Sequence, residues 1–257
     1  IMIYKIHKTK IYIHILSFVI IVLLVSTVDA VRNMTQLPSN SVAASDGALA
    51  TFFNPAGVAC RSDFELCYLR TYDGSSKGDD ALFVAAAKSG LGLEFIEMED
   101  DVSFKRYTVT NATRLLGSLY LGTSYSWINA SLADYGRFNY RNYDNFSSWS
   151  MGLMFRRNNL SIGTVARDLN RPILVGGRTY DFGIALRPNT SRITFSLDLR
   201  KVENTNGIEI RYGLDIRPMD FLTFRSGYWN DKNFDIRFGV NLGYMGLGAF
   251  HAFLPSK

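Results

Sequence analysis

The feature that most constrains this fold is a strict two-residue alternation between residues 207 and 244. Two runs carry it, from Ile208 to Arg217 and from Phe234 to Tyr244. In each run, apolar or aromatic side chains occupy every second position, and charged, polar or glycine residues lie between them. Because successive side chains of a strand point to opposite faces, each run predicts a β-strand with one apolar and one polar face.

The length of these runs bears on their environment. A half-buried strand of a soluble sheet also alternates, and a secreted β-sandwich would show the same pattern. Each run, however, is roughly ten residues long, which matches the ~9–11 residues that cross a bilayer at a steep tilt. Aromatic outer faces of this length would expose more apolar surface than a soluble monomer normally carries. We therefore expect transmembrane strands with lipid outside and a polar lumen inside.

The same alternation recurs along most of the chain, broken by turn residues. The sequence predicts an all-β fold, a transmembrane antiparallel up-and-down β-barrel of about twelve strands, with ten to fourteen open, because bacterial barrels have an even number. Residues 129–146 are interpreted either as the longest loop or as a frayed strand extension. The expected strands are 64–70, 81–88, 91–95, 102–109, 115–127, 149–155, 160–166, 180–187, 193–200, 208–217, 234–244 and 247–253, with a further stretch between turns at 217–220 and 229–232.

Residues 1–30 have the organisation of a secretory signal peptide. Lys5, Lys8 and Lys10 form a basic start, an apolar run follows from residue 11 to residue 28, and the segment ends at Ala30. The alternative is an uncleaved membrane anchor. A cleaved signal predicts export, and together with the strands it predicts the bacterial outer membrane as the location and its lipid as a partner.

Residues 31–62 are small and polar and contain no long strand pattern. They include the run Ala-Thr-Phe-Phe-Asn-Pro-Ala-Gly at 50–57, in which Asn54-Pro55 forces an extended or turn geometry. By its chemistry alone this run is a tight turn. It resembles the Asn-Pro-Ala-Gly motif of the FadL-like outer-membrane proteins, which include long-chain fatty-acid transporters and PorV-type secretion shuttle proteins. The resemblance implies that 31–62 is a lumenal hatch, that 63–257 is the barrel, and that Asn54, Pro55, Ala56 and Gly57 shape the plug.

A second resemblance covers roughly residues 145–250. The stretches 149–156, 161–170, 180–188 and 224–228 are similar to the barrel region that precedes the protease domain in some signal peptide peptidase A-type proteins. That family uses a serine and a lysine that lie in the downstream domain, which is not part of residues 1–257. This resemblance implies a barrel that would anchor a missing periplasmic protease.

Charged residues recur at the polar positions of successive strands. They are interpreted either as cross-strand ion pairs that fill a narrow lumen, or as a lining that selects a solute or holds the hatch. The set comprises Asp181, Arg187, Asp198, Arg200, Glu209, Arg211, Asp215, Arg217, Arg225, Asp235 and Arg237.

The sequence argues against an enzyme and against nucleic-acid binding. Outside the expected signal peptide the one histidine is His251, and no phosphate loop, nucleophile elbow or metal-ligand spacing is present. The net charge of +5 includes +2 from residues 1–30, which leaves a weak and dispersed +3. Cys60 and Cys67 are either a disulfide or two thiols. We expect no catalytic residue, no metal and no cofactor.

These observations predict passive uptake of hydrophobic or amphipathic small molecules through an outer-membrane barrel. The alternative is a non-catalytic barrel that docks exported proteins or anchors a protease domain. The ligand or exported protein would be the partner in each case.

Overall fold

The computed structural model describes residues 41–70, 80–97, 103–131, 146–170, 178–188, 192–203, 205–219, 222–229, 233–241 and 246–253. The expected signal peptide, residues 31–40 of the expected hatch, and residues 132–145 lie outside this part of the chain. No helix within the described ranges is long and apolar enough to cross a bilayer.

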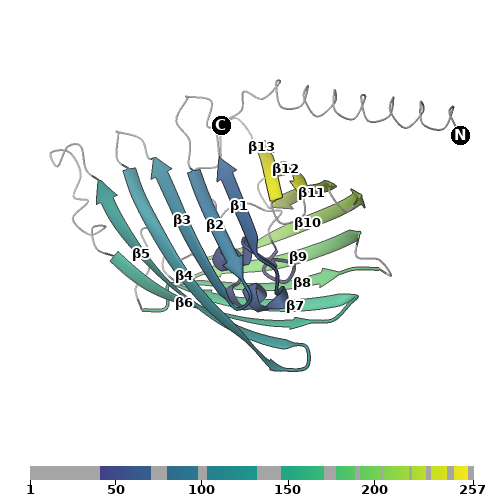
Figure 1. The fold of residues 1–257 in the computed structure, drawn as a ribbon, viewed down its shortest axis with the longest axis horizontal. Helices are drawn as coiled ribbons and strands as arrows, with labels where there is room; N and C mark the ends of the chain where they lie inside the picture. Colours follow the sequence, from purple (N-terminus) through teal and green to yellow (C-terminus); the bar gives the residue numbers. More distant parts are fainter. Residues whose placement is uncertain are drawn as a thin grey trace, which may run out of the picture.

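One antiparallel sheet of thirteen strands makes up most of the described chain, and each strand pairs with the next in sequence (Figure 1). This confirms the all-β up-and-down meander, with thirteen strands where we expected about twelve. The strands are β1 (Glu65–Arg70), β2 (Asp80–Ala86), β3 (Ser89–Glu97), β4 (Ser103–Leu116), β5 (Leu119–Ser131), β6 (Phe146–Arg156), β7 (Leu160–Arg167), β8 (Thr179–Leu186), β9 (Ile193–Val202), β10 (Ile208–Met219), β11 (Leu222–Trp229), β12 (Asn233–Asn241) and β13 (Gly246–Phe253).

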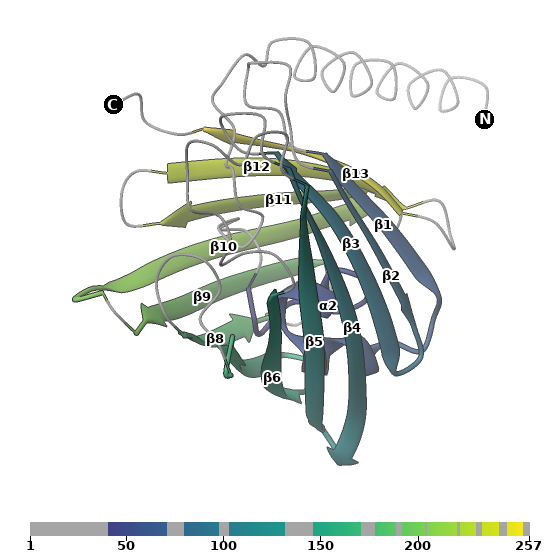
Figure 2. The ribbon, with the colours of Figure 1, turned by 90° about the vertical axis from the view of Figure 1, so that its left-hand side faces the viewer.

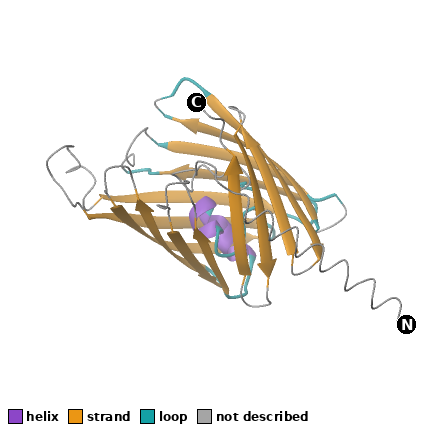
Figure 3. Cartoon of the chain, turned by 90° about the horizontal axis from the view of Figure 1, so that it is seen from above, coloured by secondary structure: helices purple, strands orange, loops and turns teal. Residues whose placement is uncertain are grey.

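The sheet curls until its two edge strands lie side by side. Figures 1 and 2 place β13 next to β1, and Cα atoms of the two strands come within 8 Å of one another. Within the described ranges, no hydrogen-bonded register joins these two strands. The two short helices lie inside the curled sheet, as the view from above shows (Figure 3). The wall is therefore a barrel that encloses a segment of its own chain.

Two of the expected strand boundaries are wrong. The expected strand 102–109 is longer, since β4 continues to Leu116, and the expected strand 115–127 is shifted to Leu119–Ser131, because the chain turns at Gly117 with a φ of 47°. The expected turn at 217–220 is also misplaced, since β10 runs through Pro218. A register shift between Ile216 and Met219 accommodates this proline, which lacks the N–H that a regular ladder would use.

The outer face of the sheet is apolar and exposed. Leu91, Trp149, Phe182 and Tyr212 expose between 44% and 57% of their surface, although they are large hydrophobic residues in regular strands. Other exposed members of this face include Tyr68, Leu82, Phe95, Val109, Met151, Leu153, Tyr180, Leu186, Phe195, Leu197, Leu199, Ile208, Ile216 and Tyr228. A soluble monomer does not normally expose apolar side chains on so many neighbouring strands.

An aromatic ladder crosses part of this outer face. The rings of Tyr107 on β4 and Trp127 on β5 stack with centroids 5.3 Å apart. The ring of Tyr125 lies 4.8 Å from that of Trp149 on β6. Such amphipathic rings concentrate where a membrane meets water.

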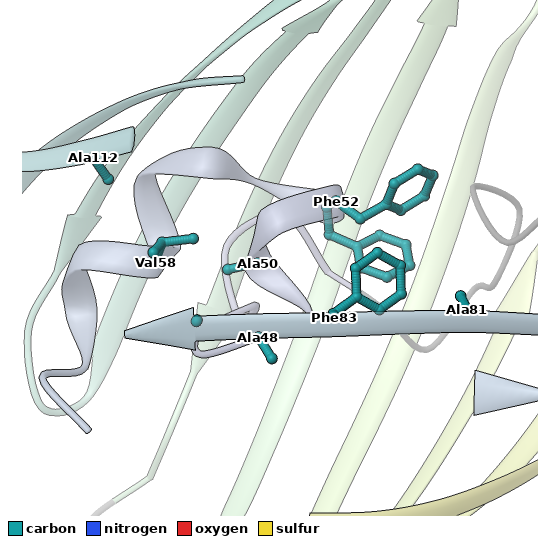
Figure 4. Close-up of a cluster of buried hydrophobic side chains, with 9 residues drawn as sticks. Ala48, Ala50, Phe52, Val58, Ala81, Phe83 and Ala112 are labelled. Atoms are coloured by element: carbon teal, nitrogen blue, oxygen red, sulfur yellow. The ribbon is translucent and has the colours of Figure 1, made fainter. Parts of the chain in front are cut away.

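Residues 41–60 form what we call the inner segment, with helix α2 (Ala50–Phe53) followed by the 3-10 helix η2 (Pro55–Cys60). Its apolar side chains pack against the inward face of β2, where Ala81, Phe83 and Ala85 are buried (Figure 4). The rings of Phe52 and Phe83 lie 6.0 Å apart. This contact explains why β2 has an apolar inward face, unlike a strand that faces water in a lumen.

The connections between strands differ at the two ends of the barrel. One end, here the short-turn end, is closed by brief connections such as 87–88, 117–118 and 220–221. The other, here the long-loop end, has longer ones such as 132–145 and 168–178. The inner segment enters β1 from the short-turn end.

Candidate functional site

The Asn54-Pro55 pair shapes the inner segment by hydrogen bonding. The side-chain oxygen of Asn54 accepts from the backbone N–H of Ala56 at 3.1 Å, which caps η2, and Pro55 occupies the first position of that helix. The side-chain nitrogen of Asn54 donates to the carbonyl of Val42 at 2.6 Å. One buried asparagine therefore joins the start of the inner segment to its second helix.

Glycines of the barrel wall allow this turn to approach closely. A Cβ added at Gly122 would lie 2.2 Å from the carbonyl carbon of Pro55 and 2.3 Å from the nitrogen of Ala56. One added at Gly152 would lie 2.2 Å from the side-chain oxygen of Asn54. Gly122 and Gly152 are direct partners across β5 and β6. The wall therefore lacks side chains at the positions where the Asn-Pro turn rests.

The same arrangement continues onto neighbouring strands. A Cβ at Gly163 would lie 2.4 Å from the carbonyl oxygen of Val42, and one at Gly90 would lie 2.2 Å from the hydroxyl of Thr51. Gly183, which pairs with Gly163 across β7 and β8, meets the side chain of Val42. We call these inward-facing positions the glycine track: Gly90, Gly122, Gly152, Gly163 and Gly183.

Arg167 at the end of β7 holds the C-terminal end of α2. Its two terminal nitrogens donate to the carbonyls of Phe52 and Phe53, each at 2.5 Å, and its Nε donates to Asp181 at 3.0 Å. Asp181 also accepts two hydrogen bonds from Arg200, at 2.6 and 3.1 Å. The last carbonyls of a helix have no intrahelical donor, so a buried guanidinium satisfies them.

Phe52 lies close to two cations of the wall. The guanidinium of Arg106 is 4.5 Å from the centre of the Phe52 ring, and that of Arg167 is 5.8 Å from it. Arg106 also forms a bidentate ion pair with Glu94 on the neighbouring strand β3, at 2.5 and 2.6 Å. The ring thus fills space between charged groups and adds cation–π attraction.

The start of the inner segment is joined to β9. The hydroxyl of Ser41 donates to Asp198 at 2.8 Å, and the backbone N–H of Val42 donates to the other carboxylate oxygen at 3.1 Å. Asp198 is buried. These bonds place a wall carboxylate directly against the backbone of the inner segment.

Asp46 forms the remaining charged contact, an ion pair with Arg156 at 2.7 Å. Burial on its own would raise the pKa of Asp46. Attraction to Arg156, Arg217 and Arg61, together with the hydrogen bond to Arg156, outweighs burial and lowers this pKa to about 2. Asp46 is therefore ionised at neutral pH, and the ion pair persists.

The structure brings most of the sequence-predicted lumen charges to the inside of the wall. Asp181, Arg187, Asp198, Arg200 and Arg211 are buried. Four pairs of opposite charge are direct partners across neighbouring strands: Asp181 with Arg200, Asp198 with Arg211, Arg200 with Glu209, and Asp215 with Arg225.

The remaining predicted charges lie on β10, β11 and β12. Arg225 donates to Asp215 at 2.7 Å, and Arg217 lies 3.5 Å from the same carboxylate. Glu209 exposes 48% of its side chain and accepts from Arg211 at 2.8 Å. Asp235 and Arg237 lie in β12, and their side chains are outside the described part of the structure.

Several residues that hold the inner segment were absent from the sequence-based set. Arg106, Glu94, Arg156 and Arg167 are among them. The signal was present for Arg167, because the alternation that places residues 160, 162, 164 and 166 on one face leaves residue 167 on the opposite, inward face. Cys60 and Cys67 are both thiols, and the Sγ of Cys60 lies 3.4 Å from the sulfur of Met154.

A cavity of about 1140 Å³ lies at the short-turn end, between the inner segment and the wall. We call it the vestibule. It is lined by Ala44, Asp46, Cys60, Arg114, Ser118, Tyr120, Arg156, Arg157, Asn158, Asn159, Leu160, Arg187, Thr194, Asp215 and Arg217. Five arginines and two aspartates face this space, so its lining carries a net positive charge.

A second cavity adjoins the vestibule along the inner segment. It shares Ala44, Thr194 and Asp215 with the vestibule and has a volume of about 20 Å³. A space of this size holds roughly one water molecule. On this side of the inner segment, a large cavity and a cavity of the size of one water molecule therefore lie next to each other.

The charged side chains of this site are arranged as ion pairs, helix contacts and cavity lining. In the described ranges, no group of three or more His, Cys, Asp or Glu side chains is placed to hold a metal ion. The charged groups are committed to the inner segment, to one another and to the vestibule.

Comparison with known proteins bears on the fold. No protein-family model matches the chain, and no curated protein does. Among solved structures, the fold is similar to that of the toluene transporter TbuX of Ralstonia pickettii, with a TM-score of 0.50 and 12% sequence identity; the match covers 83% of this chain and 91% of that one. At this identity the similarity shows the fold alone, and it supports the FadL-like barrel that the Asn54–Gly57 motif implies. The resemblance of residues 145–250 to a peptidase-associated barrel stays a prediction.

Proposed function

We propose that this chain is an outer-membrane β-barrel through which hydrophobic or amphipathic small molecules pass passively. The observation that carries the proposal is the vestibule of about 1140 Å³ inside the wall, with a second cavity of about 20 Å³ beside the inner segment that shares three lining residues with it. The exposed apolar side chains of β3 to β11 support a lipid-facing outer surface.

The two ends of the barrel support an orientation. Bacterial barrels have short periplasmic turns and longer external loops. By this rule the vestibule opens towards the periplasm and the 132–145 connection lies outside the cell. The inner segment stands between the two sides as a hatch, and passage requires it to move.

The lumen supports amphipathic molecules more strongly than purely apolar ones. TbuX is described as a toluene transporter, and its similarity to this chain supports a transporter in general terms. In the described residues, a cluster of apolar side chains inside the barrel surrounds Phe52 and Phe83, whereas the vestibule is lined mainly by polar and charged groups. A molecule with a polar head and an apolar body fits this division.

The direct test is uptake by intact Gram-negative cells that lack their own channel of this type. We expect cells that produce the protein to accumulate radiolabelled octanoate faster than cells with an empty vector. Toluene is measured in parallel. Equal initial rates for both solutes with and without the protein would contradict the proposal.

A crosslink tests whether the hatch must move. The Cys60 and Met154 sulfurs are 3.4 Å apart, so Met154→Cys places two thiols in proximity between the inner segment and β6. In a Cys67→Ser background, oxidation or a two-carbon bis-methanethiosulfonate should join them. Uptake should fall on crosslinking and recover on reduction. The matched control is Met154→Ser in the same background; unchanged uptake by the crosslinked protein would show that passage does not require this movement.

A further inference from the structure

The vestibule contains a cation whose charge is not neutralised by a neighbouring carboxylate. Arg187 is 8% exposed, and its Nη1 donates to the hydroxyl of Ser161 at 2.6 Å. Among the residues that the structure describes, no carboxylate lies within 4.0 Å of its guanidinium, whereas Arg167, Arg200 and Arg225 each have one. A buried charge without a partner is costly unless something compensates it.

The surroundings of Arg187 add to its unbalanced charge. Burial, and then repulsion from Arg156, lower the pKa of Arg187. Attraction to the more distant Asp46 and Asp215 acts in the opposite direction and raises it. Asp46 is paired with Arg156, and Asp215 with Arg225. Both carboxylates of the vestibule therefore already form ion pairs with other arginines.

Two more arginines in the vestibule have no carboxylate partner in the described part of the chain. The guanidinium of Arg114 lies over Tyr120 at 5.9 Å and donates to the carbonyl of Gly117 in its own turn. That of Arg157 lies over Phe155 at 5.7 Å. Arg114 lies near the end of β4 and Arg157 directly follows β6, both at the short-turn end and both on the rim of the same cavity as Arg187. Their charges and that of Arg187 converge on one space.

We propose that the vestibule is a binding site for a small organic carboxylate, with Arg187 as its buried anchor and Arg114 and Arg157 on its rim. The planar guanidinium fork matches the two oxygens of a carboxylate. Leu160 and Tyr120 line the same cavity and offer contact to an apolar body. The inference rests on the proposed function, because it names the class of molecule that this passage would favour.

A singly charged carboxylate suits the site better than a phosphate dianion. Asp46 and Asp215 face the same space, so a second negative charge on the ligand would be repelled by both. The cavity volume of about 1140 Å³ also leaves room for an organic body, which inorganic phosphate lacks.

The test is direct binding to the purified protein in nanodiscs, which does not depend on passage. Benzoate is the ligand, benzamide its neutral counterpart and inorganic phosphate the competing anion, each measured by isothermal titration at low ionic strength. We expect benzoate to bind about tenfold or more tightly than benzamide, as one charge-assisted hydrogen bond would provide. We also expect benzoate to bind more tightly than phosphate.

The variants locate the site. Arg187→Gln and Arg157→Gln should each weaken benzoate binding, by about tenfold for the buried residue and less for the exposed one. Arg187→Lys should retain part of the affinity, because it keeps the charge but loses the fork. The matched control is Arg178→Gln, which removes an arginine that pairs with Glu203 at the opposite end of the barrel and should bind benzoate normally.

Folding of each variant is checked by its gel mobility before and after heating. If Arg187→Gln does not fold, Arg157→Gln provides the test instead, because Arg157 lies on an exposed turn. Equal binding of benzoate and benzamide would overturn the proposed site. So would an unchanged affinity for benzoate in both the Arg157 variant and any Arg187 variant that folds. Tighter binding of phosphate would overturn the choice of a carboxylate. Failed uptake by cells with intact benzoate binding would reject the passage and leave the site in place.

Discussion

At the scale of single residues, Arg167 has the most demanding role. It joins the wall to the inner segment through two carbonyls of α2 and to β8 through Asp181. Because all these groups are buried, each polar atom depends on the others for its hydrogen bonds. The contact therefore resembles a helix cap supplied by a distant strand, and it fixes where α2 ends.

Arg167→Met should destabilise the folded protein substantially. The substitution leaves two helix carbonyls without their guanidinium donor, and we expect a loss of roughly 3 kcal/mol, the upper range for a hydrogen bond to a charged group. The measurement is urea-induced unfolding in detergent micelles, followed by tryptophan fluorescence. Arg178→Met is the matched control; its ion pair with Glu203 at 3.2 Å is partly exposed and should contribute less than about 1 kcal/mol. Equal losses in the two variants would refute the capping role.

At the scale of elements, the glycine track determines how closely the inner segment can approach the wall. Gly122→Ala should push the Asn-Pro turn away, because its Cβ would lie 2.3 Å or less from backbone atoms of Pro55 and Ala56, which cannot rotate aside. Overpacking of this kind costs about 1–3 kcal/mol. The displacement should be visible at the thiol of Cys60.

Maleimide labelling of Cys60 in a Cys67→Ser background measures this displacement. Burial raises the pKa of Cys60 to about 11, so the thiol reacts slowly in the seated segment. We expect labelling of Gly122→Ala to be about tenfold faster, in line with the overpacking cost. Gly207→Ala is the control, since a Cβ there would have no atom within 4 Å. An unchanged rate in Gly122→Ala would mean that the inner segment does not rest on the track.

The outward face of β8 provides a test of lipid contact. Phe182 is 44% exposed in the middle of this strand. Phe182→Arg should destabilise the protein in a bilayer by about 2–4 kcal/mol if this position lies near the membrane midplane. Asn206→Arg, in an exposed connection, should change stability by less than about 0.5 kcal/mol. Unfolding titrations in lipid vesicles compare the two, and a Phe182→Arg protein as stable as the control would place this face in water.

The elements themselves were largely predictable from sequence, because side-chain alternation reports directly on strands. The expected strand 193–200 lies within β9, and the expected strand 160–166 within β7. The boundary at Gly117 was not predictable, since Leu115 and Leu116 are apolar and were assigned to the following strand, whereas they end β4. Pro218 was interpreted as a turn, although a local register shift keeps it in β10.

The candidate site was less accessible to sequence reasoning. Alternation shows that Gly122 and Gly152 face inward, but only the folded chain shows that Asn54 and Pro55 lie against them. Likewise, the partners Arg167 and Phe52 are 115 positions apart in the chain. Contacts between a plug and a wall depend on how the plug is seated, and no local pattern records this.

At the scale of the whole molecule, the barrel combines an apolar outer surface, a polar inner wall and an inner segment held by charged side chains. The wall carries buried ion pairs such as Glu94 with Arg106. Wall side chains in such pairs also bond the inner segment, as Arg167 does at the carbonyls of Phe52 and Phe53. Buried pairs of this kind contribute little net stability compared with apolar packing, but they fix one arrangement. This suits the proposed role of the inner segment as a hatch with one defined resting position.

The central claim, that this chain folds as a barrel in the outer membrane, is tested most directly by fractionating cells and comparing gel mobility with and without heating. We expect the protein to be recovered with outer-membrane fragments. We also expect the unheated sample to migrate as a compact band that shifts to its full apparent mass on boiling. A soluble protein whose band does not shift on heating would contradict the barrel and with it the proposed passage.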